Sequence, residues 1–270
     1  MFDLHVHSAP CVLPRLGDDV ETVGWYEAAG FTGCVLKGHA EPTAGRARAA
    51  AAGRRVAVHG AVVLNGAVGG LNPGAVEAAL GLGARVVWMP TLDARAHLDA
   101  GLPRPRLGAA VFAIPPVDPT NESAVLEICT LVAEADAVLA TGHLSGPEIA
   151  WLLPRARAAG IRRVLLTHPS FMVPSLDAST TRALAEQGAY VEVTAYQLLH
   201  QPELTAARLA AFVRDVGPER CLLSSDAGQP DSPRPAEALG RLVEALAAEG
   251  LDRGRLDAMA AEVPERLVTL

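Results

Sequence analysis

The residues best suited to chemistry in this sequence are histidines and one aspartate that occur in or just after short apolar runs. His5 and His7 lie in the first run, FDLHVHS, with one residue between them. Successive side chains of a strand point to opposite sides, so both imidazoles can reach one side and ligate one metal ion. His143 follows VLATG, His168 follows VLLT and Asp226 follows CLLSS. Buried groups of these types need a hydrogen-bond partner or a cation, which predicts a shared polar site.

Lys37 is the only lysine in the chain, since the other 22 of its 23 Lys and Arg residues are arginine. Arginine cannot replace lysine where the amine must lose its proton or where a compact ammonium is required. Three interpretations stay open: an ammonium that holds a substrate anion or a developing oxyanion, a carbamylated metal ligand, and a structural lysine. His39 is a candidate metal ligand or substrate contact, and Asn65, at the end of the third run, is a candidate hydrogen-bond partner of the substrate.

Other polar residues receive structural interpretations. His59 lies inside the third run rather than at its end, which predicts a hydrogen-bonded core histidine. His97 and His200 are expected in loops, facing solvent. Glu192 has the same strand parity as Tyr190, so we expect it to line the interior of the fold and to pair with a base.

Eight apolar, β-branched runs must position these residues, at 2–6, 33–38, 55–64, 84–89, 136–142, 162–167, 189–194 and 220–225. Amphipathic segments that predict helices alternate with them, at 18–29, 43–52, 74–82, 121–135, 146–159, 177–187, 203–214, 235–249 and 252–268. The runs recur about every 31 residues, the length of a βα unit. We therefore predict one α/β domain over residues 1–270, a (β/α)8 TIM barrel, with the Pro-rich segment 102–119 as an excursion after strand four.

A doubly wound open sheet is the competing architecture, because it also alternates strands and helices. It requires a Gly-rich phosphate turn after an early strand, and the only candidate, NGAVGGLNPG at 65–74, lacks the G-x-G-x-x-G spacing. In a barrel, active-site residues gather at the carboxyl ends of the strands. The candidate histidines, Lys37 and Asp226 all fall at such ends.

Composition restricts the class of partner. Hydrophobic residues make up 50% of the chain and charged residues 20%, with a net charge of -7. These values favour a globular protein without a broad basic surface. We therefore expect a small-molecule substrate and expect neither nucleic acid nor a membrane as a partner. A homo-oligomer is possible. The four cysteines are far apart and form no C-x-x-C pair, and the amino terminus has no export signal, which predicts a reduced, cytoplasmic protein.

The motifs DLHVHS, SSDAG and EVPERLVTL, together with histidines ending strands five and six, resemble the amidohydrolase superfamily of metal-dependent hydrolases. This resemblance implies that His5, His7 and Asp226 bind a metal, and that His143 and His168 bind a second ion or divide between ligation and catalysis. Strand four lacks the bridging Lys or Glu of many two-metal members, which favours one divalent ion, with two as the alternative. The imidazole-rich ligand set favours Zn²⁺.

The function that we predict is metal-dependent hydrolysis of an amide, lactone or other ester. In this mechanism Asp226 accepts a proton from water, His168 stabilises the oxyanion, and Lys37 or His39 fixes an anionic group. Related sites also support deamination and decarboxylation. DLHVHS with VLKGHAEPT is similar to the polymerase-and-histidinol-phosphatase phosphoesterases as well, which implies a multi-metal site with His39 as a ligand. A noncatalytic metal- or ligand-binding barrel is the non-enzyme alternative, because a fold alone does not establish turnover.

Overall fold

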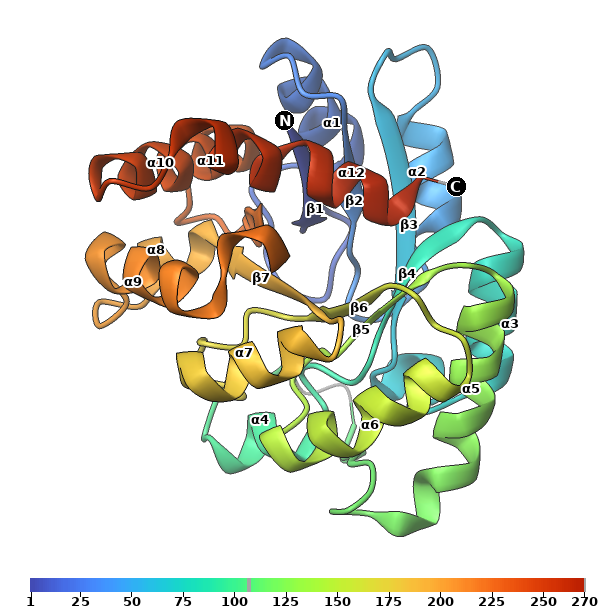
Figure 1. Cartoon of the computed structure of the whole chain (residues 1–270). Helices are drawn as coiled ribbons and strands as arrows, with labels where there is room; N and C mark the ends of the chain where they lie inside the picture. The colour runs from blue at the N-terminus through green and yellow to red at the C-terminus, as the bar shows by residue number, and fades with distance from the viewer. Residues whose placement is uncertain (106–107, 270) are drawn as a thin grey trace.

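The computed structural model describes residues 1–105 and 108–269, and in it eight parallel strands follow one another in chain order (Figure 1). Hydrogen bonds of 2.8 Å from Asp226 N to His5 O and of 2.9 Å from His7 N to Ala227 O join the last strand to the first. The predicted (β/α)8 barrel is confirmed, and the sequential order rules out a doubly wound sheet. The strands are β1 (Phe2–Val6), β2 (Gly33–Leu36), β3 (Ala57–Val63), β4 (Ala84–Trp88), β5 (Val138–Ala140), β6 (Val164–Leu166), β7 (Tyr190–Thr194) and β8 (Cys221–Ser224).

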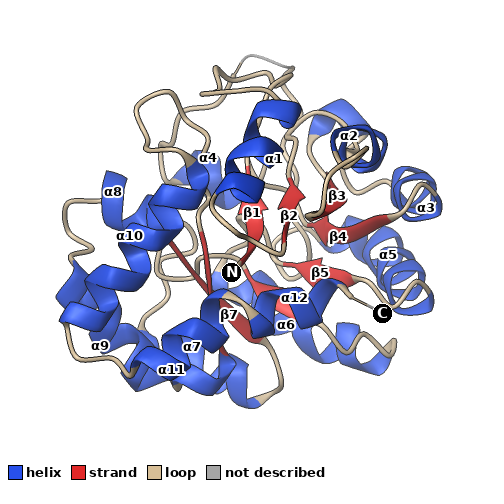
Figure 2. Ribbon diagram, turned by 90° about the horizontal axis from the view of Figure 1, so that it is seen from above, coloured by secondary structure: helices blue, strands red, loops and turns tan. Residues whose placement is uncertain are grey.

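Helices surround the strands, as the view along the barrel shows (Figure 2). Their bounds are α1 (Asp19–Ala28), α2 (Ala44–Ala50), α3 (Pro73–Gly81), α4 (Arg95–Asp99), α5 (Glu122–Glu134), α6 (Gly146–Ala158), α7 (Ala178–Glu186), α8 (Ala195–His200), α9 (Ala206–Val216), α10 (Pro235–Ala248), α11 (Arg253–Ala260) and α12 (Glu262–Val268). Single 3₁₀ turns occur at Gly66–Val68, Pro119–Asn121 and Pro218–Arg220. All of the predicted helical segments therefore contain helix.

The structure corrects two features of the helix prediction. The short helices α4 and α8 were not expected, and they carry His97 and His200, which we had placed in loops. The segment 252–268 forms two helices rather than one, with Ala261 outside the helical region at φ -132° and ψ -72°. Pro264 explains the break, because its ring lacks an N–H and clashes with the carbonyl four residues earlier unless it lies in a first turn.

The inside of the barrel is apolar from the end where the strands begin up to Trp88, the last residue of β4. Phe2, Leu4 and Trp88 lie in one buried cluster with the inward-facing valines and leucines of the other strands. Helix α12 covers this end, with Val263, Leu267 and Val268 in the same cluster (Figure 2). Each fully buried side chain of this size stabilises the fold by about 1.5–3 kcal/mol. The polar candidates are left at the opposite end, where the strands finish.

The expected excursion after strand four is present and tied down. Arg104 Nη1 donates to Asp93 Oδ1 over 2.8 Å and to Ala110 O over 2.9 Å, while Phe112 and Asp93 are joined by a backbone hydrogen bond. These contacts fold the segment over the site end of the barrel. Residues 106–107 of the predicted excursion and residue 270 of the predicted domain lie outside the described residues.

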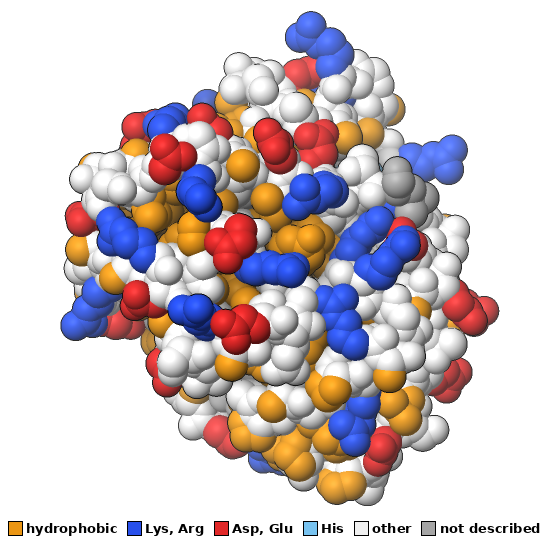
Figure 3. Space-filling view, in the orientation of Figure 1, with side chains coloured by type: hydrophobic (Ala, Val, Ile, Leu, Met, Phe, Trp, Pro, Cys, Tyr) orange, Lys and Arg blue, Asp and Glu red, His pale blue; other side chains and the backbone are white. Residues whose placement is uncertain are grey.

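On the face shown in Figure 3, basic and acidic side chains of the described residues are interspersed with apolar ones. In that part of the chain, no helix is both long and apolar enough to cross a bilayer. That neither nucleic acid nor membrane is a partner stays a prediction.

Candidate active site

A β-bulge in β1 turns both histidines of the HxH pair into the barrel. The pairing register of β1 against β2 shifts within residues 3–6. Leu4 packs in the interior cluster, and the ring of the next residue, His5, also faces inward, 5.4 Å from the ring of Trp88. His7 follows on the same side, with its ring 5.3 Å from that of His5. Bulges re-aim side chains in this way beside active sites.

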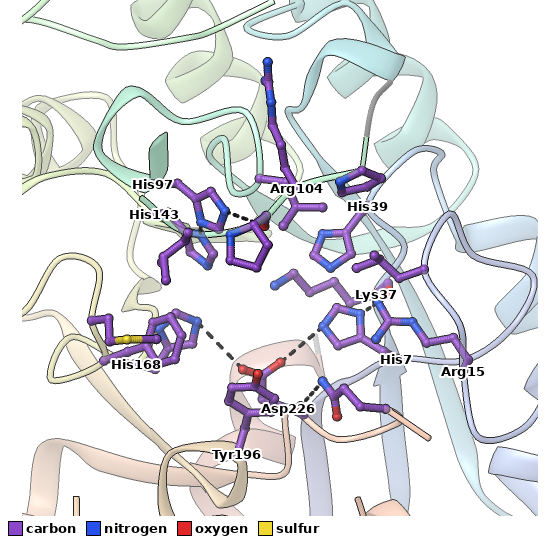
Figure 4. Close-up of a pocket in the computed structure, with 18 residues that line it drawn as sticks. His7, Arg15, Lys37, His39, His97, Arg104, His143, His168, Tyr196 and Asp226 are labelled. Atoms are coloured by element: carbon purple, nitrogen blue, oxygen red, sulfur yellow. Dashed lines mark hydrogen bonds and ion pairs between the residues drawn. The ribbon is translucent and has the colours of Figure 1, made fainter. Parts of the chain in front are cut away.

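His5, His7 and Asp226 form a compact group of potential metal ligands. Asp226 Oδ1 lies 3.1 Å from His5 Nε2 and 3.2 Å from His7 Nε2, and one ligand atom from each residue falls within 4.8 Å of the others. All three residues are buried, and Figure 4 shows His7 and Asp226 meeting at the floor of a cavity. The structure therefore brings together the three residues to which the sequence assigned one ion.

The hydrogen bonds behind the two imidazoles occupy their Nδ1 atoms, so that the ligation of a cation would use Nε2. His7 Nδ1 donates to the carbonyl of Lys37 over 3.0 Å, and His5 Nδ1 faces Glu192 Oε1 at 3.1 Å. When it is neutral, an imidazole held in this way presents its Nε2 lone pair on the side of Asp226; His7 Nε2 lies 3.2 Å from Asp226 Oδ1, and His5 Nε2 lies 2.8 Å from Lys37 Nζ. Since three electron-pair donors then face one another, a cation among them fits the donor set, and such Nδ1 partners are typical of histidine ligands.

Asp226 is held in place by its own backbone and by the turn that follows. It has φ 48°, and Gly228 has φ 119°, where a Cβ would lie 1.9 Å from the carbonyl oxygen of His7. Only glycine permits that close approach. Burial would raise the pKa of Asp226, but the charge of His5 and hydrogen bonds from His5 and His7 outweigh it and hold the pKa well below its usual value. Asp226 is therefore a carboxylate at neutral pH.

Glu192 connects two of the candidate residues from inside the barrel. Its Oε1 accepts from His5 Nδ1 and, over 2.6 Å, from Ser224 Oγ, while its Oε2 accepts from the backbone N of His168 over 3.2 Å. Burial raises its pKa, yet the charge of His5 outweighs this and leaves the pKa below the usual value. The prediction that Glu192 lines the barrel and pairs with a base is confirmed.

Lys37 lies at the centre of the site. Its Nζ is 2.8 Å from His5 Nε2 and 5.0 Å from the centre of the Trp88 ring. Burial lowers its pKa from 10.5 to about 8, so the amine loses its proton more readily than a surface lysine does. The short distance between the two nitrogens requires one shared proton. Lys37 consequently competes with any cation for the lone pair of His5.

His168 faces Asp226 across the cavity, with Nε2 3.9 Å from Asp226 Oδ2 (Figure 4). Burial lowers the pKa of His168 to about 4, which keeps the imidazole neutral at pH 7. Its Nδ1 is buried and has no hydrogen-bond partner within the described ranges. A buried polar atom of this kind is rare unless a ligand or ion satisfies it.

His143 is oriented by His97, which sequence reasoning had placed in solvent. His97 is buried; its Nε2 donates to the carbonyl of Pro103 over 3.1 Å, and its Nδ1 lies 2.8 Å from His143 Nδ1. Burial lowers the pKa of both histidines, so both are neutral. His97 Nδ1 must therefore accept from His143 Nδ1, which leaves the Nε2 lone pair of His143 free. Nothing in the sequence around His97 signals this role.

The remaining predicted substrate contacts have different surroundings. The ring of His39 stacks on that of His7, with ring centres 4.7 Å apart, and lines the cavity outside the three-ligand group. Asn65 is buried behind it: its Nδ2 donates to His39 O and Thr91 Oγ1, and its Oδ1 accepts from the backbone N of Thr91 and Asp93. Asn65 thus ties two loops together, and we leave it out of the proposed site.

Two further histidines lie elsewhere. His59 is half-buried in β3, and its Nε2 has no partner among the described residues, so the predicted hydrogen bond is not seen there. His200 is half-buried on α8, with Nε2 2.8 Å from Ser232 Oγ. Its prediction as a solvent-facing loop residue was wrong, because α8 packs against α10.

These side chains surround a cavity of about 480 Å³ at the carboxyl ends of the strands. Its polar wall contains His7, Lys37, His39, His143, His168 and Asp226. Apolar side chains from the loops, among them Leu13, Leu102, Phe171 and Met172, form the rest. A cavity of this volume suits a small organic molecule.

The fold and site define a (β/α)8 barrel with a candidate metal centre at the carboxyl ends of its strands. The chain belongs to the family described as Family of unknown function (DUF6282), whose model matches residues 1–192. That match includes every candidate ligand except Asp226. No curated protein matches the chain.

Several solved structures share the fold. The organophosphorus hydrolase from Deinococcus radiodurans is 14% identical with a TM-score of 0.66, and the match covers 99% of this chain and 92% of that one. An amidohydrolase from Pseudomonas aeruginosa is 12% identical with a TM-score of 0.62, covering 99% and 94%. A protein of Agrobacterium tumefaciens is 17% identical with a TM-score of 0.64, covering 100% and 95%. The resemblance to amidohydrolase barrels is thereby confirmed for the fold.

Proposed function

We propose that this protein is a metal-dependent hydrolase that cleaves an amide, lactone or other ester bond of a small molecule. The observation that carries the proposal is the convergence of His5 Nε2, His7 Nε2 and Asp226 Oδ1 at the floor of the cavity, with both Nδ1 atoms already engaged. A purely structural polar cluster has no need to direct three electron-pair donors at one point. The similarity in fold to structures named as hydrolases supports the same class of activity.

We propose Zn²⁺ as the ion, because imidazole and carboxylate ligands suit it, and one ion per chain, because His143 and His168 lie outside the three-ligand group. A divalent ion at this position supplies Lewis acidity and lowers the pKa of water toward about 7. His5, His7 and Asp226 would hold the ion, and Glu192 orients His5. A second ion on His143 and His168 is the alternative stoichiometry.

The protein's own groups then carry the proton and bind the substrate. Asp226, ionised at neutral pH, accepts a proton from water and returns it to the leaving group. His168, neutral and with Nε2 facing the cavity, is placed to donate a hydrogen bond to the oxyanion that forms at the carbonyl. The ammonium of Lys37 binds a negatively charged oxygen; its carbamylation, to give a metal ligand, is the competing role. His39 and the apolar loops position the remainder of the substrate.

Metal analysis tests this proposal. Protein purified without chelator should contain about one divalent ion per chain, and the His5→Ala/His7→Ala double variant should lose it while keeping its circular dichroism spectrum. His59→Gln is the matched control, because this histidine is remote from the cavity. Metal-free wild-type protein from several preparations, or a folded double variant with stoichiometric metal, contradicts the proposal.

We also propose that the protein works on a small molecule in the cytoplasm. The volume of the cavity supports the first point, and the four free cysteines, three of them buried, are consistent with the second. A homo-oligomer stays a prediction, which light scattering on the purified protein tests.

A further inference from the structure

Arg15 is a cavity residue whose charge meets no carboxylate of the described residues. It belongs to the loop between β1 and α1 and lines the cavity beside His7 and Lys37 (Figure 4). Its Nε and Nη2 are buried, and neither has a hydrogen-bond partner in residues 1–105 or 108–269. The residue as a whole is half-buried, and its side chain reaches the cavity. Buried polar atoms without a partner are rare, so this arrangement points to a group that is supplied from outside the chain.

Two arginines nearby show what a satisfied guanidinium looks like in this fold. Arg46 donates from Nε and Nη2 to the two oxygens of Asp19 over 2.8 and 2.7 Å. Arg104, also at the cavity, donates to Asp93 over 2.8 Å. Each of these charges is neutralised by a carboxylate of the protein. Within the described part of the chain, Arg15 has no such carboxylate partner.

The loop that carries Arg15 is anchored on both sides of it. Leu16 N donates to Gly228 O, and Ala9 N donates to Gly17 O, each over 2.8 Å. The first of these bonds ties the loop to the turn that follows Asp226. The backbone that carries Arg15 is thus fixed relative to the candidate metal ligands.

The charges around the cavity favour an anion next to Arg15. Asp226 is the only acidic residue among the described residues that line the cavity, and His5 and His7 already face it. Lys37 and Arg15 add positive charge to the same cavity. Uncompensated positive charge that lines a cleft attracts anionic ligands.

We propose that Arg15 binds the carboxylate of the substrate, so that the protein acts on a small carboxylic acid with an apolar body. The planar guanidinium matches a two-oxygen carboxylate, as Arg46 does with Asp19. The apolar body lies against Leu13 and Phe171. The hydrolysis of an acyl bond in this molecule rests on the function proposed above, whereas recognition of the carboxylate does not.

Calorimetry with a matched ligand series tests the proposal. The probes are benzoate, phenylacetate, 3-phenylpropionate and 4-phenylbutyrate, each paired with its neutral amide, and phenyl phosphate. Wild-type protein should bind at least one carboxylate more tightly than its amide. Arg15→Gln should weaken that carboxylate by about 30-fold or more and leave the amide unchanged. Arg55→Gln, which removes a charge that is 93% exposed, is the control and should change neither.

Each outcome has a defined meaning. Failure of every carboxylate to bind more tightly than its amide, or an equal loss of both ligands in Arg15→Gln, overturns the proposal, and tighter binding of phenyl phosphate overturns the choice of carboxylate. Arg15→Lys keeps the charge and should retain part of the selectivity even if Arg15→Gln folds poorly. Metal content is measured in the same samples, so absence of metal with intact carboxylate selectivity refutes the proposed hydrolase function and leaves this inference standing.

Discussion

Replacement of Glu192 by glutamine tests whether the carboxylate behind His5 prepares the metal site. Glu192 accepts three hydrogen bonds, from His5 Nδ1, Ser224 Oγ and the backbone N of His168. Glutamine keeps one oxygen for His5 and Ser224, but it removes the negative charge that makes His5 a stronger ligand. It also places an NH₂ group against the backbone N–H of His168, which leaves a buried donor unpaired.

The size of both effects follows from these contacts. Loss of an outer partner of a metal-bound histidine weakens metal affinity by about 10–100-fold, equivalent to about 1.4–2.8 kcal/mol. The unpaired buried donor costs about 1–3 kcal/mol of unfolding free energy. Glu192→Gln should therefore fold, bind Zn²⁺ more weakly and unfold at lower urea concentration.

A competition titration against a chromophoric zinc chelator measures the dissociation constant, and urea denaturation of the metal-free protein measures stability. Ser224→Ala is the control, because it removes one hydrogen bond from the same carboxylate while its charge remains, and it should change zinc affinity by less than about tenfold. A folded Glu192→Gln protein whose zinc affinity stays within about twofold of wild type would refute the reasoning.

Three further predictions concern the cavity. Asp226→Asn should lower turnover of a verified substrate by about 10²–10⁴-fold, since an amide cannot accept the water proton; a rate near that of wild type would remove Asp226 from the base role. Lys37→Arg should reduce turnover with metal content retained; a parallel loss of metal, with bicarbonate restoring metal binding in wild type alone, indicates carbamylation instead, and no change in either indicates a structural lysine. The pKa of His168 is about 4 against an ordinary 6.5, so the unfolded chain takes up more protons as the pH falls below about 6.5. The metal-free protein should consequently lose about 3 kcal/mol of unfolding free energy from this residue between pH 6.5 and pH 4, and denaturation midpoints independent of pH over that range would contradict the shift.

Local patterns in the chain were sufficient to predict the barrel and the end of it where the site lies. Strand runs that alternate with amphipathic helices at βα spacing admit few arrangements, and parallel strands bring all their carboxyl ends to one side. Residues that follow the runs, such as His143, His168 and Asp226, therefore lie close together at the carboxyl-terminal end of the barrel. Glu192 could be placed on the inner face because its alternation with Val191 and Val193 is purely local.

Tertiary structure decided which of these groups interact. Simple alternation from Leu4 would turn His5 away from the interior, and the bulge that reverses it depends on pairing with β2. His97 is the partner of His143 because α4 folds over the site. The side chain of Asn65 forms hydrogen bonds with backbone groups of two loops. Arg15 is one of 22 arginines in the sequence, and nothing local distinguishes it from the others. The packing of the described residues shows that Arg104, the other arginine at the cavity, pairs with Asp93, whereas Arg15 has no carboxylate partner there. Such roles depend on contacts between residues far apart in the chain, which periodicity and spacing do not encode.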